Sequence, residues 1–319
     1  MRTILPNSRT GRWQPGIAMV ELMIALVLGM LVVLAVTTVV LTSKSAQSTQ
    51  IDASNTQDTA WYALNNIARS VRQAGFVNYD KNDGPYTNTE FMTSSITGVD
   101  ARSLKATSTG IESPVASANN SSDILAIRFF GSGTGVPDNT VLSCSGFGVS
   151  APSTSEEDER RWSIYYVAND SNGEPNLYCK YKDRTDRNFA TVSIAQGVES
   201  FQVLYGIDTS SPANGIANQF LNATEIDALD IDISAAELNK KTHWKKITAI
   251  KVALLIRGTE NSSFDTTATT FNLFGEEYSK SRSGADKGIQ FIGADFPATH
   301  KNRLRKSYST TIQIRNPLN

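Results

Sequence analysis

A single carboxylate stands in an otherwise apolar stretch near the start of the chain. The residues from Ile17 to Leu41 include one charged side chain, Glu21, and two threonines, Thr37 and Thr38. An ionised carboxylate inside a membrane costs roughly 2.5–3.5 kcal/mol even on the milder insertion scales. A positive partner offsets that cost, because attraction between opposite charges grows as the dielectric constant falls. Glu21 is therefore the first candidate functional residue, and ion pairing within lipid is the chemistry it could perform.

Two cysteines are the next candidates. Cys144 and Cys179 lie 35 positions apart (179 − 144), well beyond the apolar stretch. If this part of the chain is extracytoplasmic, a disulfide between them is favoured. By the loop-closure formula such a bridge contributes about 3–4 kcal/mol. Two buried free thiols are the alternative.

The other reactive residues lack the spacing that catalysis or metal binding requires. His243 and His300 are far apart, fit no metal-ligand pattern and are expected at the surface or in a strand. Asp227, Asp230 and Asp232 could bind calcium, but the glycine and the terminal glutamate of an EF-hand loop are missing. There is no Gly-x-Ser-x-Gly elbow and no Cys-x-x-Cys pair. The sequence therefore predicts no enzyme activity and no cofactor or metal.

The charge balance argues against a general nucleic-acid binder. The 319 residues carry a net charge of −1, whereas phosphate binding requires a basic excess. One basic cluster, Lys301, Arg303, Arg305 and Lys306, precedes the expected last strand. Such charges either guard a strand against aggregation or contact an anionic surface such as DNA. We favour the guarding role and expect nucleic acid not to be a partner.

The apolar stretch predicts a membrane-spanning helix. At about 1.5 Å per residue, Ile17 to Leu41 is long enough to cross a hydrocarbon core of ~30 Å. The 16 residues before it carry three arginines and no acid, which keeps the N-terminus cytoplasmic and sends the rest of the chain outwards. A secretory signal has a shorter apolar core and a small-x-small cleavage site. A plain anchor explains the length but not Glu21.

The segment from Gly16 to Leu26 resembles the class III signal of type IV pilins and pseudopilins. In that family a prepilin peptidase cuts after the glycine, the new N-terminus is methylated, and a glutamate stands fifth after the cut. The resemblance implies cleavage between Gly16 and Ile17, N-methylation of Ile17, and pairing of Glu21 with the free amine of a neighbouring subunit. Ile17 replaces the usual phenylalanine, and Pro15 replaces a basic residue.

The helix is expected to continue beyond the membrane as far as Ala74. Residues 43–74 contain neither proline nor glycine, and Ala60, Leu64, Ile67 and Val71 recur at helical spacing. Gly75 is a suitable C-terminal cap. The outer half is thus amphipathic, and we expect a folded domain to pack on it.

The rest of the chain is typical of antiparallel β-structure. Asn172-Gly173 predicts a hairpin turn. Residues 78–122 are expected to be mostly loops, with one short helix or strand at most. The Ser210–Ala223 segment is read as an irregular insertion, residues 225–239 as a short helix, Gly131–Gly135 as a linker and Glu156–Arg161 as a solvated turn. The expected strands are Asp123–Phe130, Trp162–Val167, Asn176–Tyr181, Thr191–Ala195, Val198–Ile207, Ile247–Ile256 and Tyr308–Ile314.

Four further motifs resemble the PilW family of minor pilins. They are Arg69–Phe76, Gly197–Asp208, Val252–Arg257 and Thr310–Asn316. The resemblance implies an α+β fold, in which a long N-terminal helix with a transmembrane half and an amphipathic half packs on a mainly antiparallel β-sheet head. The expected parts are a leader at 1–16, a transmembrane half at 17–41, an amphipathic half at 42–75 and a periplasmic head at 76–319.

The implied function is that of a structural subunit. A PilW-like minor pilin joins other minor pilins in the complex that primes a type IV pilus and caps its tip, and so serves twitching motility, adhesion or DNA uptake. Implied partners are the prepilin peptidase, the other minor pilins, the major pilin, a tip adhesin and the inner-membrane assembly platform. The implied location is the inner membrane and then the extracellular pilus. Gly29 is either a close-approach point between helices or simply tolerated.

Two alternatives stay open at the level of sequence. A minor pseudopilin of a type II secretion system has the same plan, and only the internal motifs favour the pilus. A membrane-anchored periplasmic enzyme or binding protein is the alternative from another class.

Overall fold

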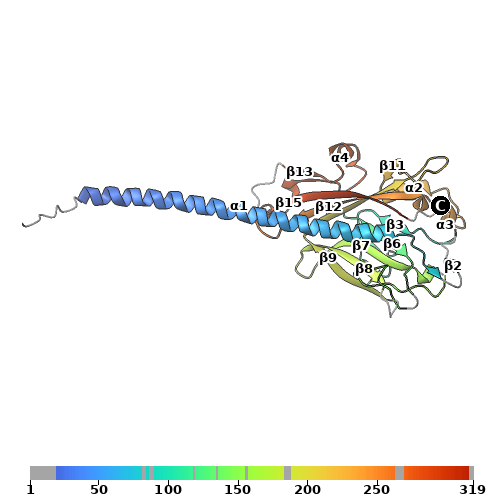
Figure 1. Cartoon of the computed structure of the whole chain (residues 1–319). Coiled ribbons are helices and arrows are strands. Elements are labelled where there is room, and N and C mark those ends of the chain that lie inside the picture. The colour runs from blue at the N-terminus through green and yellow to red at the C-terminus, as the bar shows by residue number, and fades with distance from the viewer. Residues whose placement is uncertain are drawn as a thin grey trace, which may run out of the picture. The chain divides into compact units, whose positions relative to one another are not determined.

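The computed structural model describes residues 19–80, 84–85, 90–117, 119–133, 136–154, 157–182, 188–262 and 269–315. The chain forms two compact units, Met1–Ser48 and Thr49–Asn319. Helix α1, Met19–Gln73, begins in the first unit and ends in the second (Figure 1). The predicted leader, Gly16 and Ile17 lie outside the described residues.

Within the second unit, α1 has one buried face. Ala60, Ile67 and Val71 are almost completely buried, and Leu64 packs against the same core. The helix ends where the chain turns at Gly75, whose φ of 68° is the left-handed conformation that favours glycine. The predicted amphipathic half and its cap are therefore confirmed.

One sheet of the head has five antiparallel strands in the order β3-β6-β7-β8-β9. Strands β7 and β8 form the predicted hairpin, with Tyr166 opposite Tyr178. Its turn is closed by hydrogen bonds between Asp170 and Glu174, and Gly173 has a φ of 81°. The strands are β3 (Ile96–Val99), β6 (Ile124–Phe129), β7 (Arg161–Asn169), β8 (Pro175–Lys182) and β9 (Phe189–Gln196).

A second sheet has four antiparallel strands in the order β11-β10-β12-β15. Its central strands are long, β12 is rich in β-branched residues, and nearly every residue in both strands is buried. This is the pattern expected when both faces of a strand are covered. The strands are β10 (Val198–Ile207), β11 (Gln219–Leu221), β12 (Ile247–Arg257) and β15 (Arg305–Gln313).

Short elements connect these sheets. The pairs β1–β2, β4–β5 and β13–β14 each form a two-stranded sheet. Four 3₁₀ turns lie at Glu157–Glu159, His243–Lys246, Gly293–Asp295 and Ala298–His300. The other elements are β1 (Tyr79–Asp80), β2 (Gly84–Pro85), β4 (Arg102–Ser103), β5 (Val115–Ala116), α2 (Ala223–Leu229), α3 (Leu238–Lys241), β13 (Thr270–Asn272), α4 (Glu276–Arg282) and β14 (Gln290–Ile292).

One core joins the helix to both sheets. Ala63 and Ile67 of α1 share it with Tyr165 of β7, Val203 of β10 and Val252 of β12. Removal of this much apolar surface from water is the main stabilising term of such a domain. The α+β fold predicted from the sequence, a long helix on mainly antiparallel sheet, is confirmed, with two sheets sharing the head.

Several local predictions are wrong. Residues 78–122 contain five short strands, and β3 precedes the strand that was expected to come first. Within the predicted irregular insertion, Gln219–Leu221 forms β11. The predicted short helix at 225–239 is divided into α2 and α3, and β15 begins three residues earlier than expected. Both histidines lie in 3₁₀ turns and are partly exposed, which fits the surface alternative and not the strand alternative.

Within the charge run at 156–161, Asp158 is exposed as predicted, but Arg160 departs from the predicted solvated turn. Arg160 is fully buried, and its guanidinium pairs with Glu157 and donates to the Thr93 carbonyl at 2.7 Å. Burial lowers the pKa of Arg160 to about 10, which still leaves it charged at neutral pH. A long side chain with five donors can be buried when enough acceptors meet it.

Candidate assembly site

The part of α1 in the first unit exposes apolar side chains all round. Leu22, Val33 and Leu41 are each more than half exposed, and among the described residues this is the one helix long and apolar enough to cross a membrane. Thr37 and Thr38 donate their hydroxyls to the carbonyls of Val33 and Ala35, both at 2.7 Å. A helix that satisfies its own polar groups in this way is suited to lipid or to a bundle of apolar helices.

Glu21 lies in the first turn of α1, and its residue is exposed. Within the described part of the chain its carboxylate has no ion-pair or hydrogen-bond partner. A carboxylate held among apolar side chains without a cation is costly in lipid. A Cβ at Gly29 would meet nothing within 4 Å, so a close approach at Gly29 requires a second chain.

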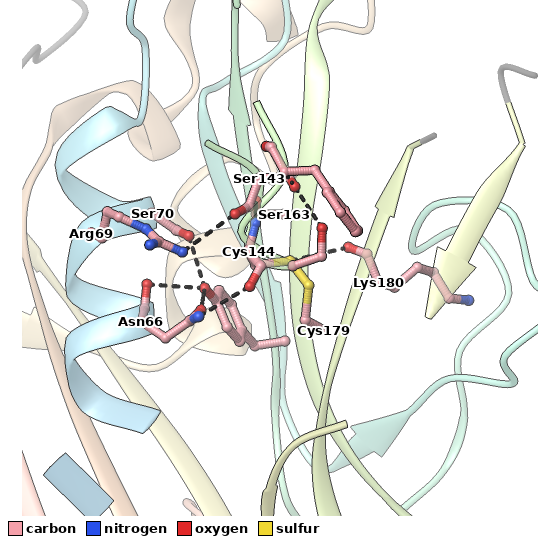
Figure 2. The surroundings of a disulfide bond; sticks show 11 residues. Asn66, Arg69, Ser70, Ser143, Cys144, Ser163, Cys179 and Lys180 are labelled. Atoms are coloured by element: carbon pink, nitrogen blue, oxygen red, sulfur yellow. Dashed lines mark hydrogen bonds between the residues drawn. A yellow bond between two sulfur atoms is a disulfide. The ribbon is translucent and has the colours of Figure 1, made fainter. Parts of the chain in front are cut away.

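The disulfide lies where α1 meets the five-stranded sheet (Figure 2). Cys144 and Cys179 are bonded, as the sequence had favoured, with Cα atoms 6.0 Å apart, and both are fully buried. Cys179 belongs to β8, and Cys144 belongs to the loop after β6. The backbone N–H of Cys144 donates to the Ser163 hydroxyl of β7 at 3.0 Å. The bridge therefore fastens the loop to the sheet.

Polar side chains of α1 reach this loop. Asn66 donates its amide to the Cys144 carbonyl at 3.0 Å, and Arg69 donates to the Ser143 carbonyl at 3.4 Å. The Tyr165 hydroxyl donates to the Asn66 side chain at 2.5 Å and lies 2.8 Å from the Ser70 hydroxyl. Burial raises the pKa of Tyr165, so its hydroxyl remains a donor. Helix, loop and sheet are joined by one buried polar network (Figure 2).

A second polar contact holds α1 at Asp52, in the first turns of the helix that belong to the second unit. The buried Asp52 carboxylate accepts from the Ser262 hydroxyl at 2.6 Å and from the Thr259 N–H at 3.2 Å. A Cβ at Gly258 would stand 2.2 Å from this carboxylate. Only glycine therefore fits where the chain leaves β12 beside Asp52.

Part of the predicted basic cluster is buried in an ion-pair network. Glu199 of β10 accepts from Arg305 at 2.6 Å and 2.9 Å and from Arg257 at 2.9 Å. Glu174 at the hairpin turn also pairs with Arg257 and with Arg303. Arg305 is 4% exposed, so it is no contact for DNA. Buried charges of this kind require close partners.

Two residues of the acidic cluster and one of the histidines have structural partners. Asp230 accepts from the Thr242 hydroxyl and lies 2.6 Å from His243 Nδ1, and Asp227 accepts from the Trp244 indole at 2.7 Å. These contacts hold the turn after α3 against α2. In the described ranges no three His, Cys, Asp or Glu side chains could together hold a metal ion.

Burial and neighbouring acids raise the pKa of two other aspartates. Asp123 is buried beside Asp100, and its pKa is well above the usual value, although the N–H groups of Ala101 and Val203 donate to it. Burial raises the pKa of Asp286 to about 6, and Tyr278 donates to its carboxylate at 3.0 Å. These groups lie within the fold and serve packing.

Sequence reasoning did not identify Asp52, Asn66 or Glu199. Asp52 and Asn66 lie on the buried face of α1 together with Ala60, Ala63 and Ile67. A polar residue at an apolar position of a helical pattern is the signal that could have identified both. Glu199 sits in a strand that is buried throughout, which is a comparable signal.

Comparisons with known proteins bear on this arrangement. Residues 164–316 match the family described as Type IV Pilus-assembly protein W, or PilW. Among solved structures, a type IV-like pilin from Thermus thermophilus is similar over 82% of this chain and 97% of its own, with 14% identity and a TM-score of 0.36, a likeness too distant to carry an argument. No curated protein matches the chain.

The chain combines a long helix, apolar in its first part, with a mainly antiparallel head. Residues 164–316 match the PilW family of pilus-assembly proteins, which confirms the resemblance seen in the sequence over that range.

Proposed function

We propose that this chain is a minor pilin of a type IV pilus. It is cut between Gly16 and Ile17, is N-methylated at Ile17 and waits in the inner membrane with its head in the periplasm. It then joins other minor pilins in the complex that primes the pilus and caps its tip. The observation that carries the proposal is the exposed apolar first part of α1 with its one carboxylate, in a chain whose residues 164–316 match PilW.

The proposed mechanism is packing without catalysis. The apolar side chains of α1 leave lipid and pack against apolar helices of neighbouring subunits, where van der Waals fit and polar pairing drive association. Glu21 pairs with the free amine of a neighbour, and this ion pair sets the register between the two helices. The head is fixed to α1 through Asp52, Asn66 and Arg69. Its surface therefore lies at a defined position along the axis of the assembly.

The match to PilW supports the pilus over the type II secretion alternative, whose subunits share the plan. The pairing of Asp227, Asp230 and His243 with side chains of the fold supports a structural role over an enzyme or a binding protein.

Mass spectrometry of the purified protein tests the processing. We expect an N-terminal peptide that begins at Ile17 and carries one added methyl group. An intact Met1 terminus in cells that contain active prepilin peptidase would sink the pilin proposal. The substitution Gly16→Val, at the cut, should give the uncut chain and serves as the control.

Replacing Glu21 should impair assembly and leave membrane insertion intact. Glu21→Val removes the proposed partner of the neighbouring amine, so we expect incorporation into pili to fall at least about tenfold, the equivalent of about 1.4 kcal/mol. Immunoblots of sheared pili and of the membrane fraction measure both quantities.

Thr37→Val is the matched control in the same helix. Its hydroxyl is bonded to the Val33 carbonyl of its own helix, so its loss should leave incorporation unchanged. Equal incorporation of the Glu21 variant and the wild type would refute the pairing role.

A further inference from the structure

The four-stranded sheet is apolar on both faces. Successive side chains of a strand point to opposite sides of a sheet. Val252 and Leu254 of β12 lie in the main core with α1, whereas Ala253 and Leu255 lie in a second core on the other face. Residues 270–296, which we call the cover segment, lie over that face, and Figure 1 shows β13 and α4 of this segment on the side of β12 away from α1. The side chains that the cover segment adds to the second core are those of Phe271, Leu273, Phe274, Ile289 and Phe296.

Polar contacts also hold the cover segment. The Ser200 hydroxyl of β10 donates to the Gly288 carbonyl at 3.3 Å, and a Cβ at Gly288 would stand 2.6 Å from the Asn120 carbonyl oxygen. Two residues earlier, Asp286 is 4% exposed, and its carboxylate accepts from the Tyr278 hydroxyl at 3.0 Å. The chain between α4 and β14 therefore lies close against β10 and the loop before β6, and Asp286 is buried in this contact.

Acids from other segments surround Asp286. Asp100, Asp123 and Glu225 lie near enough to act on its charge. Asp100 accepts from the first two N–H groups of α2 at 3.0 Å and 2.7 Å. Arg282 of α4 pairs with Glu225, and in the described ranges no cation pairs with Asp286. A negative charge on Asp286 is therefore both removed from water and repelled by its neighbours.

The proton on Asp286 is bound more tightly when the cover segment is in place. Burial and the acids Asp100 and Glu225 raise the pKa of Asp286 from 3.8 to about 6, although hydrogen bonds from Tyr278 and Asn222 oppose the shift. When the cover segment leaves the sheet, the carboxyl reaches water and its pKa returns towards 3.8. The closed form is therefore most stable below about pH 4, loses stability as the pH rises through about 6, and changes little above that.

We propose that Asp286 is a proton-controlled latch for the cover segment. With its proton, the carboxyl holds residues 270–296 against the outer face of β10 and β12. Loss of the proton places an unpaired negative charge in the buried contact and loosens the segment. The opened form exposes the apolar strip made by Leu204, Ala253 and Leu255. The device thus opens more readily at neutral pH than in acid, and it does not depend on the proposed function.

Hydrogen exchange of the full chain in detergent tests the latch without any substitution. Protection factors, which divide out the pH dependence of intrinsic exchange, are compared at pH 5 and pH 7.5. We expect those of residues 271–274 to fall roughly tenfold, the change that linkage gives for a carboxyl with a pKa of about 6 when closed and 3.8 when open. They should also lie below those of β7 at both pH values, because local opening requires less free energy than unfolding of the head. Protection that stays constant or rises with pH, or that equals the protection of β7, would overturn the inference.

A neutral mimic of the carboxyl shows whether Asp286 is the responsible group. Asp286→Asn cannot ionise, so protection of its cover segment should fall less than about threefold over the same pH range. Asp295→Asn removes an exposed carboxylate of the same segment and is the matched control, which should keep the wild-type fall of roughly tenfold. A fall in Asp286→Asn equal to that of the wild type contradicts the inference. Loss of the fall in Asp295→Asn also contradicts it, because the effect would then belong to a surface charge.

Discussion

Replacing Cys144 and Cys179 together by serine is expected to lower the free energy of unfolding of the head by about 3–4 kcal/mol. The bridge closes a loop with a sequence separation of 35, and a cross-link of this span restricts the unfolded chain by about that amount. The side chains of Asn66 and Arg69 bond the carbonyls at 143–144, so loosening this loop also weakens the attachment of α1. Denaturant titration of the full chain in detergent, followed by near-UV circular dichroism, measures the change.

Reductant gives the control for this prediction. Both sulfur atoms are fully buried, so the folded wild type should keep its bridge in dithiothreitol, whereas reduction during unfolding should shift its midpoint to that of the double variant. Exchange should increase first in residues 141–149, which the bridge holds against the sheet. Identical midpoints for the wild type and the variant, both without reductant, would contradict the structural role of the bridge.

The elements predicted well from the sequence are those set by local pattern. Ile67 and Val71 follow the 3.6-residue period, and Ile247–Ile256 is an apolar run rich in β-branched residues. The hairpin around Gly173 follows from a two-residue turn signal. The disulfide had one possible pairing, because the chain has two cysteines. Glu21 stands out because one charge in an apolar run is costly wherever the chain folds.

The elements that were missed depend on contacts distant in sequence. Ile96 pairs with Ile127 across 31 positions (127 − 96), so nothing near β3 in the sequence indicates its partner. Arg160 is buried because the Thr93 carbonyl and the Ser95 hydroxyl reach it from a loop far upstream. A local pattern of charges predicts exposure, and tertiary hydrogen bonds reverse that prediction.

Glu199→Gln is expected to destabilise the head by about 3–5 kcal/mol, because removal of one partner leaves buried charges uncompensated. The wild-type network sets Glu174 and Glu199 against Arg257, Arg303 and Arg305. The variant leaves one acid for three arginines, and Arg257 and Arg305 are 7% and 4% exposed. Thermal and denaturant unfolding of the full chain measure the loss.

Glu276→Gln is the matched control, since it breaks an exposed pair with Lys280 in α4, and it should shift the unfolding midpoint far less than Glu199→Gln does. A triple variant gives the sharper test. Glu199→Met, Arg257→Leu, Arg305→Met replaces the three most buried charged residues of the network by apolar side chains, so it should recover most of the stability lost in Glu199→Gln. If Glu199→Gln has the same free energy of unfolding as the wild type, Glu199 does not stabilise the ion-pair network. If the triple variant loses more than the single one, other contacts of the arginines, such as the Arg305 guanidinium stacked over the Phe296 ring at 3.9 Å, outweigh the ion pairs, and the ion pairs are not the main stabilising contact at this end of the sheet.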